Sequence, residues 1–286
     1  MKLANVSGRA ALVTVEGTVV DVDRASSGAF GADITDVYER WDDFLSWARD
    51  ADLDAFEAQP LSEKALGSPS PRPRQILAVE LNYSAHAAES GFERPEKPPP
   101  VFTKFVSALT GPFTTVDLPE GGNTDWEVEL TVIMGKEAHH VAASDAWDYV
   151  AGLTAAQDLS ERVTQLQGPA PQLGFGKSFP GFLPVGPYLV TPDEFEDRDA
   201  IDLCSDIDGE IMQRGNTRDL IFSVAHLIEG LSNIVTLYPG DLILTATPEG
   251  IGAGRKPPRF LSDGEVLTSR IQGIGELRQS FVANRG

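Results

Sequence analysis

The sequence predicts a β-rich α+β protein. From about residue 75 onward, short apolar runs of strand length alternate with Gly- and Pro-rich segments, a pattern typical of strands joined by turns. Helical patterns are few and fall near residues 84–90, 143–151 and 218–232. No internal repeat and no long low-complexity tract is visible. These observations favour mixed sheets with a small number of covering helices.

The first 67 residues are predicted to form a small separate α/β domain. Two apolar runs, 10–15 and 18–22, flank Glu16-Gly17 as the strands of a β-hairpin flank their turn. An amphipathic helix is expected over about 35–49.

A proline-rich segment, residues 68–74, is predicted to be a stiff linker after this domain. The second domain would then occupy residues 75–286. A chain of 286 residues is long enough for one or two domains with a large core.

Charge and composition exclude several classes of partner. The net charge of −20 disfavours nucleic acid and anionic membranes, and any acidic substrate has to be held by local cations. The single cysteine, Cys204, rules out an intrachain disulfide and suits a reducing compartment. No stretch approaches the ~20 apolar residues of a membrane span. We therefore expect a cytoplasmic protein.

Two acidic residues stand in a predicted apolar strand, residues 126–135. Side chains alternate along a strand, so Glu127 and Glu129 share one face, about 7 Å apart along the chain. Buried together, two carboxylates repel each other unless a cation lies between them. The alternative is a half-exposed strand whose acidic face is solvated, and from this pair alone the alternative is the better explanation.

A third acid, Asp158, follows in Ala155–Arg162. Taken alone it is better explained as a helix N-cap or a loop residue. With Glu127 and Glu129 it completes an all-oxygen ligand set, which suits Mg²⁺, Mn²⁺ or Ca²⁺ rather than zinc. Three protein ligands leave coordination positions open for water and substrate.

A candidate acid–base pair lies near the start of the second domain. His86 and Glu89 are three residues apart in a predicted helix, and therefore share one face. A carboxylate beside an imidazole orients the ring and raises its basicity, as a general base requires. A surface His–Glu pair is the alternative and is favoured for this spacing in isolation.

A series of motifs appears in one order along the chain and resembles the fumarylacetoacetate hydrolase family over residues 75–282. It contains Asn82-Tyr83-x-x-His86-x-x-Glu89, Glu127-x-Glu129, Asp158-x-Ser160-x-Arg162-x-x-Gln165, Gly176-Lys177-Ser178-Phe179, Pro184-x-Gly186-Pro187, Gly209-Glu210-x-x-Gln213-x-x-Asn216-Thr217, Leu237-x-Pro239-Gly240-Asp241-x-Ile243, Thr245-x-Thr247-Pro248-x-Gly250 and Gly273-Ile274-Gly275-Glu276-Leu277. The resemblance implies mixed β-sheets rolled around a metal site, preceded by a small N-terminal domain, and a homodimer.

The resemblance also implies roles for individual residues. Glu127, Glu129 and Asp158 match the family's Mg²⁺ or Mn²⁺ ligands, with Ca²⁺ as a further option. His86 and Glu89 match a dyad on a lid, here residues 84–95, that activates water. The remaining matched residues are Lys177 beside the metal and substrate oxygens, Thr247 at the substrate carboxylate, and Arg162 and Gln165 among the substrate-facing and supporting polar groups. Lys104 stays open between a site role and a solvated or structural one.

The function that these residues imply is metal-dependent hydrolysis of a C–C bond in a small 2,4-dioxo acid of the acylpyruvate type, in catabolism of aromatic compounds or sugar acids. The same site would also suit two other activities of the family: isomerisation of the 2-hydroxyhepta-2,4-diene-1,7-dioate type, and decarboxylation of oxaloacetate-like acids. A third alternative is a catalytically silent protein that binds an oxo acid.

Several positions depart from the family's pattern. Glu80 and Ala246 stand where the family commonly has glycine, Val163 and Pro180 where it has aspartate, and Gln157 where it has asparagine. These changes predict a shifted substrate preference. If Pro180 and Ala246 close the pocket, the silent alternative gains support.

Overall fold

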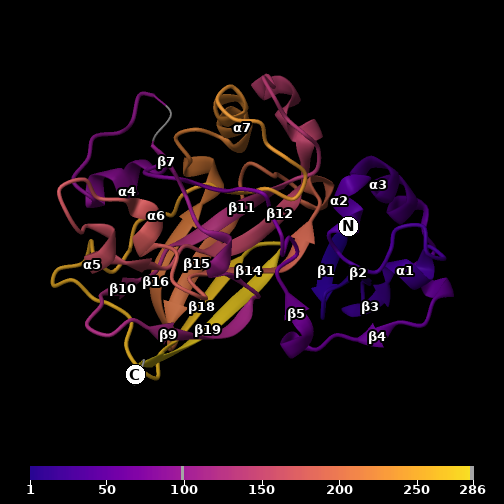
Figure 1. Ribbon diagram of the computed structural model, residues 1–286, viewed down its shortest axis with the longest axis horizontal. Coiled ribbons are helices and arrows are strands. Elements are labelled where there is room, and N and C mark those ends of the chain that lie inside the picture. The colour runs from indigo at the N-terminus through magenta and orange to yellow at the C-terminus, as the bar shows by residue number, and fades with distance from the viewer. Residues whose placement is uncertain (98–99, 284–286) are drawn as a thin grey trace.

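The computed structural model describes residues 1–97 and 100–283, so residues 98–99 and 284–286 of the predicted second domain lie outside it. Its largest sheet has twelve strands and runs from the N-terminal hairpin into the middle of the molecule (Figure 1). Ten strands follow the order β4-β3-β2-β1-β14-β12-β11-β17-β6-β7, while β5 pairs with β1 and β8 with β14. The strands are β1 (Lys2–Val6), β2 (Arg9–Val13), β3 (Thr18–Asp21), β4 (Gln59–Pro60), β5 (Leu66–Gly67), β6 (Ile76–Val79), β7 (Val101–Thr103), β8 (Leu109–Thr110), β11 (Val128–Met134), β12 (Val150–Gln157), β14 (Leu183–Val190) and β17 (Leu242–Leu244).

Two smaller sheets complete the β-structure. A five-stranded sheet has the order β16-β15-β18-β19-β9, and its strands are β9 (Phe113–Leu118), β15 (Asp202–Ile207), β16 (Glu210–Asn216), β18 (Val266–Ile271) and β19 (Gly275–Ala283). β10 (Thr124–Asp125) pairs with β13 (Ser160–Glu161) beside the start of β11. Parallel pairs occur within otherwise antiparallel sheets, for example β17 with β6 and β19 with β9. The predicted β-rich α+β class is confirmed.

The N-terminal hairpin forms as predicted from β2 and β3. The helix expected over 35–49 is divided at Arg40, whose φ of −136° and ψ of 47° are not helical, into α2 (Asp36–Glu39) and α3 (Trp41–Asp50). The Arg40 guanidinium lies over the Phe30 ring and donates to Asp43, so the residue at the break makes side-chain contacts on both sides of it. A short helix, α1 (Val22–Ala25), follows the hairpin.

The N-terminal strands belong to the same sheet as the rest of the chain. β1 pairs with β14 in antiparallel register, with Leu3 opposite Leu189. The proline-rich segment is packed rather than free, because Ser70 Oγ donates to the Gly240 carbonyl at 2.6 Å and Tyr38 donates to the Pro69 carbonyl at 2.8 Å. The indigo part of Figure 1 is therefore continuous with the larger part through hydrogen-bonded strands.

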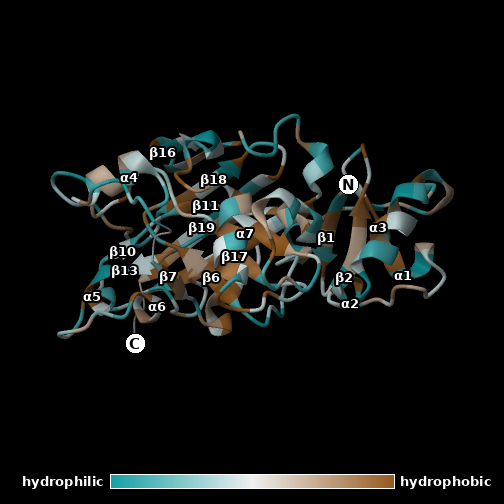
Figure 2. Cartoon of the chain, turned by 90° about the horizontal axis from the view of Figure 1, so that it is seen from above, coloured by the Kyte–Doolittle hydropathy of each residue, from teal (hydrophilic) through white to brown (hydrophobic). Residues whose placement is uncertain are grey.

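The central strands are apolar on both faces. Along β11 and β17, Ile133 and Leu244 pack in one buried cluster, whereas Val132 and Ile243 pack in another. Alternation sends neighbouring residues to opposite faces, so this sheet lies between two cores. Figure 2 shows the brown strands inside and mostly teal segments around them.

The remaining helices are short. α4 (Ser84–Glu89) confirms the helix predicted near 84–90. The helix expected over 143–151 is a 3₁₀ helix, Ala143–Tyr149, that leads directly into β12, and the one expected over 218–232 begins only at Val224 as α7 (Val224–Ser232). In the described part of the chain, no helix has the length and apolar character needed to cross a membrane.

Candidate metal centre and active site

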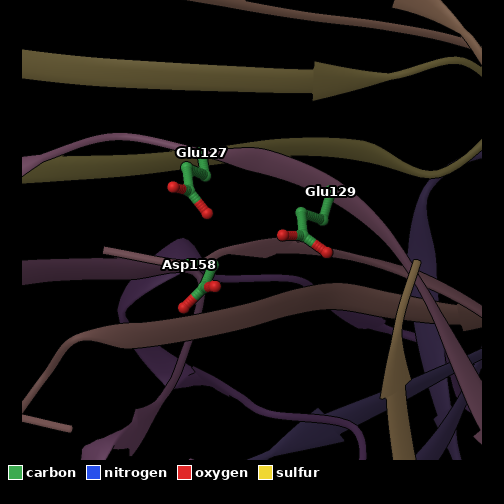
Figure 3. A group of neighbouring side chains, drawn as sticks. All are labelled: Glu127, Glu129 and Asp158. Carbon is green, nitrogen blue, oxygen red and sulfur yellow. The ribbon is translucent and has the colours of Figure 1, made fainter. Parts of the chain in front are cut away.

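Three buried carboxylates meet where β11 begins and β12 ends. Glu127 immediately precedes β11, Glu129 lies on it, and Asp158 immediately follows β12. The two strands are antiparallel, with Val128 opposite Gln157, which brings these strand ends together. One ligand oxygen from each carboxylate lies within 4.8 Å of the others, and Figure 3 shows the three groups pointing into one space.

The acidic face of this strand is not solvated. Glu127, Glu129 and Asp158 are 6%, 2% and 0% exposed. The half-exposed strand is therefore the wrong alternative. Burial of three acids without compensation would be unfavourable, so the surrounding charges decide what the site can hold.

Backbone hydrogen bonds fix the positions of the carboxylates. The Asp158 amide donates to the Glu127 carbonyl at 2.9 Å, and the Ala246 amide donates to Glu129 Oε2 at 2.7 Å. The Gln157 side chain accepts from the Glu127 amide at 2.9 Å and donates to Ser269 Oγ at 2.8 Å. Gln157 thus anchors the start of β11 to the second sheet.

Two lysines, both buried, contact the carboxylates. Lys177 Nζ lies 2.6 Å from Glu127 Oε2 and 2.5 Å from Asp158 Oδ2, so it bridges two of the three acids. Lys104 Nζ lies 2.5 Å from Asp158 Oδ1, and its side chain is fully buried. The solvated alternative for Lys104 is therefore wrong.

Arg162 is the third cation of the site. It donates to Asp125 Oδ2 at 2.8 Å, to Glu127 Oε1 at 2.6 Å and to Gln165 Oε1 at 2.9 Å. Asp125 also accepts from the Gly252 and Ala253 amides, at 2.6 and 3.0 Å. Arg162 is thus held by carboxylates on one side and holds Gln165 on the other.

The pKa values of Glu127 and Glu129 are shifted in opposite directions. Burial alone would raise the pKa of Glu127, but Lys177, Arg162 and His86 outweigh burial and lower that pKa below its usual range. Burial raises the pKa of Glu129 well above its usual value, and Asp158 and Glu127 raise it further. Glu129 is the acid whose ionised form the protein compensates least.

The donor set fits a hard divalent cation. All three candidate ligands are carboxylates, which Mg²⁺ and Mn²⁺ accept. Four buried acids, including Asp125, face the three cations Lys104, Lys177 and Arg162, which leaves negative charge in excess. A divalent cation beside Glu129 would offset both the burial and the repulsion by Asp158 and Glu127 that raise its pKa.

The predicted dyad is brought to this site. His86 is only 7% exposed, and its Nδ1 lies 3.5 Å from Glu89 Oε2. Both Glu89 oxygens also accept from the Gly250 amide, at 3.1 Å each. The surface-pair alternative is wrong for His86, and Glu89 ties α4 to the loop after β17.

Thr247 is held by its hydroxyl group. That hydroxyl donates to the Val128 carbonyl at 2.9 Å and accepts from Gln213 Nε2 at 2.7 Å. Among the described residues, no acceptor bonds the Thr247 amide, which is therefore the free donor at this position.

One cavity unites these groups. Its volume is about 110 Å³, and it is lined by Val79, Glu80, Leu81, His86, Ser90, Phe92, Phe102, Glu127, Glu129, Arg162, Gln165, Lys177, Ala246, Thr247 and Ile251. Of the nine predicted site residues, Glu89 and Asp158 stand behind this lining, in contact with His86 and Lys177 respectively. The Lys177 ammonium also lies 5.0 Å from the centre of the Phe102 ring.

The altered positions fall into two groups. Pro180 and Val163 are exposed and do not line the cavity, so they do not close it. Ala246 and Glu80 do line it. Ala246 has a φ of 82°, the left-handed region where glycine is favoured, and its amide is the donor to Glu129.

Sequence reasoning missed two buried residues that position the site. Asp125 orients Arg162, and Gln213 joins Thr247 to β11 through the Val128 amide at 3.0 Å. The one signal for Asp125 is an acid directly before an apolar strand. Gln213 lies in a motif of the series, but the motif alone gives no role.

Comparisons with known proteins agree with this geometry. The family model described as "Fumarylacetoacetate (FAA) hydrolase C-terminal" matches residues 75–282. The human mitochondrial oxaloacetate tautomerase FAHD2A is 40% identical over 250 residues, which cover 87% of this chain and 79% of the relative.

Solved structures resemble the whole chain. An HpcE-like protein from Mycobacterium smegmatis is 52% identical with a TM-score of 0.93, over 99% of both chains. Maleylpyruvate hydrolase from Sphingobium sp. SYK-6, in complex with manganese(II) and pyruvate, is 30% identical with a TM-score of 0.82, over 100% of both chains.

The fold is that of a class of enzymes, and the buried acidic triad is a group that could hold a divalent metal ion. The chain belongs to the fumarylacetoacetate hydrolase family.

Proposed function

We propose that this protein is a divalent-metal-dependent hydrolase that cleaves a C–C bond in a small 2,4-dioxo acid of the acylpyruvate type. The observation that carries the proposal is the contact between the buried His86 and the partly buried Glu89, in which the imidazole lines the same cavity as Glu127, Glu129 and Lys177. A base beside a metal site is what hydrolysis needs and what simple ligand binding does not. The relative named maleylpyruvate hydrolase supports the same choice.

Each group has a distinct task in this reaction. A Mg²⁺ or Mn²⁺ ion held by Glu127, Glu129 and Asp158 would polarise the 2-oxo group and stabilise negative charge that develops on it. Lys177 offers an ammonium donor to the same oxygens. The Thr247 amide and the Gln165 side-chain amide, whose Oε1 is held by Arg162, would orient the substrate from the other walls of the cavity.

His86 performs the proton transfers. Its imidazole takes a proton from water, and the hydroxide attacks the carbonyl at C4. The C3–C4 bond breaks, which yields a carboxylic acid from the acyl part and the enolate of pyruvate. That enolate takes a proton at C3, so the imidazole returns to its neutral form. Glu89 orients the ring and stabilises its charged form.

Product analysis tests the proposal. The protein is incubated with 2,4-dioxopentanoate or oxaloacetate in the presence of Mg²⁺, Mn²⁺ or a chelator. Equal amounts of pyruvate and acetate from 2,4-dioxopentanoate, dependent on the metal, are expected. Failure to cleave any acylpyruvate while another reaction proceeds would contradict hydrolysis.

Keto–enol tautomerisation of an oxaloacetate-type acid is the second candidate. Two observations favour it: the relative named oxaloacetate tautomerase, and a cavity of about 110 Å³, well below the 300 Å³ or more usual for drug-sized ligands. Tautomerisation moves a proton at C3 without attack by water. Decarboxylation at the same site would instead release CO₂ with pyruvate from oxaloacetate.

The variant His86→Ala separates hydrolysis from tautomerisation and decarboxylation, because only hydrolysis needs the attack of water. We expect it to lower hydrolysis by roughly 10²–10⁴-fold, the usual contribution of a general base, because no other described imidazole lines the cavity. His226→Ala, an exposed histidine on α7, is the matched control and should leave the rate unchanged. Binding of an oxo acid without turnover under any metal would replace both candidates with a silent binding role.

A further inference from the structure

Glu80 brings a carboxyl group to the cavity wall that none of the proposed catalytic steps uses. It follows directly after β6, and its amide donates to the Pro100 carbonyl at 3.0 Å. The next residue, Leu81, has a φ of 53°, a left-handed conformation that few non-glycine residues adopt. The backbone therefore holds Glu80 at the cavity, between two other lining residues.

The Glu80 carboxyl group has no partner among the described residues. No hydrogen bond or ion pair joins its side chain to another described group, although the residue is partly buried. The charges that act on it are those of Lys177, Glu127, His86 and Arg162, which all line the same cavity. Burial raises its pKa, Lys177 lowers it and Glu127 raises it again.

The neighbouring cations are already engaged. Lys177 bridges Glu127 and Asp158, and Arg162 bonds Asp125 and Glu127. With a divalent ion present, Lys104, Lys177, Arg162 and the ion would balance the four buried acids and an ionised Glu80. The cavity then holds no surplus positive charge for a second carboxylate of the substrate.

We propose that Glu80 is a specificity-determining residue that restricts the cavity to 2-oxo acids whose far end, remote from the 2-oxo carboxylate, is uncharged. A substrate carboxylate placed against Glu80 meets direct repulsion or requires uptake of a proton. An uncharged far end of the substrate avoids this repulsion, and one that carries a hydrogen-bond donor can bond to the unpaired carboxyl group of Glu80. This inference rests on the proposed function and narrows its substrate class to monocarboxylates.

The consequence sets this chain apart from the relatives named above. Oxaloacetate and maleylpyruvate are dicarboxylates, whereas an acylpyruvate with an alkyl acyl group carries a single carboxylate. We therefore expect this protein to favour acylpyruvates with an alkyl acyl group over these dicarboxylates.

A binding experiment tests the charge preference without turnover. Calorimetry at about pH 8, well above the usual pKa of a carboxyl group, compares the 5-methyl ester of 2-oxoglutarate with 2-oxoglutarate in the presence of Mn²⁺. The two ligands share the same open carbon chain, and the far end is an uncharged ester in one and a carboxylate in the other. Wild type should bind the ester at least about tenfold more tightly, a difference of about 1.4 kcal/mol, because the carboxylate of Glu80 repels the second carboxylate of 2-oxoglutarate.

Three variants make the result specific. Glu80→Gln keeps the shape and removes the charge, and should reduce the preference at least about fivefold. Glu80→Gly is the second variant, should the glutamine destabilise the fold. Glu249→Gln makes the same change at an exposed glutamate outside the cavity and should keep the wild-type preference.

Equal binding of the two ligands by wild type, no binding of either, or an unchanged preference in Glu80→Gln would each overturn the inference. Because binding is measured without catalysis, a preference for the ester in a protein that hydrolyses no acylpyruvate would support the role of Glu80 and contradict the proposed hydrolysis. Hydrolysis of an acylpyruvate by a protein that binds the two ligands equally would support the proposed hydrolysis and contradict the role of Glu80.

Discussion

At the scale of the residue, Ala246 shows how this site departs from its family without losing its ligands. The resemblance marks the position as one that usually holds glycine, and the φ of 82° explains why. The amide still donates to Glu129, so the conformation is retained at a cost.

Replacing Ala246 by glycine should therefore stabilise the protein. Relief of the left-handed strain is worth roughly 1–2 kcal/mol, which exceeds the roughly 0.4–1 kcal/mol of backbone entropy that glycine loses on folding. Denaturant unfolding should show a gain of up to about 1 kcal/mol. Ala253→Gly, at an exposed position without positive φ, should instead lose stability, and the same sign for both variants would contradict the explanation.

Glu129 gives the metal-free protein a pH dependence. Its pKa in the folded state lies well above the usual 4.5, so the stabilisation linked to its proton is complete below about pH 4.5 and is lost as pH rises through the folded pKa. Within that window wild type should lose about 1.4 kcal/mol per pH unit relative to Glu129→Gln, when both are measured in a chelator.

The opposite sign applies to Glu127, whose pKa is lowered and whose contribution is lost only as pH falls below about 4.5. Added Mn²⁺ should remove the difference between wild type and Glu129→Gln in its pH dependence. If the difference in stability between wild type and Glu129→Gln in a chelator does not change with pH, Glu129 is not the acid whose charge the protein compensates least.

Much of the site could be predicted at this scale, because ligand chemistry is local. Residue type and strand periodicity made Glu127 and Glu129 candidates, the combination with Asp158 and the ordered motifs selected all three, and the structure brings them together. Lys104 and Asp125 could not be predicted, because their roles depend on strands that meet only after folding. A lysine in an ordinary sequence context gives no sign of full burial.

At the scale of the element, the aromatic cluster on α3 anchors the N-terminal part of the chain. Phe44 is 0% exposed and its ring centroid lies 5.5 Å from those of Phe30 and Trp41. Because β1 pairs with β14, loss of this cluster should be felt beyond the first 67 residues.

Phe44→Ala should cost about 3–5 kcal/mol and lower the melting temperature by roughly 6–20 °C. Circular dichroism and tryptophan fluorescence should report a single transition for the whole chain. Val15→Ala, at a fully exposed position, is the control. A separate early transition would show that residues 1–67 unfold as the independent domain that the sequence predicts.

Hairpins were easier to predict than sheet order. The turn at Glu16-Gly17 is encoded by adjacent residues and forms where expected. The pairing of β1 with β14 joins residues almost 190 positions apart, and no local pattern specifies it. The predicted helix over 35–49 was divided because Arg40 has partners of its own, which a periodicity argument does not contain.

At the scale of the whole molecule, the net charge of −20 opposes the approach of an anionic substrate. Salt screens such repulsion beyond about 10 Å at 0.1 M. We expect kcat/KM for an acylpyruvate to rise when NaCl is raised from about 0.02 to 0.3 M. Sucrose at equal osmolality should have no such effect, and a fall with salt would point to attraction by the local cations as the dominant force.

The lysine bridge described above has a consequence for metal exchange. Lys177 and Lys104 hold Glu127 and Asp158 in place through contacts that need no ion. We expect the ligand cage to be built during folding rather than by the metal, so that an ion can leave and another enter without unfolding. Cellular supply, more than the shape of the cage, would then decide which divalent ion is resident.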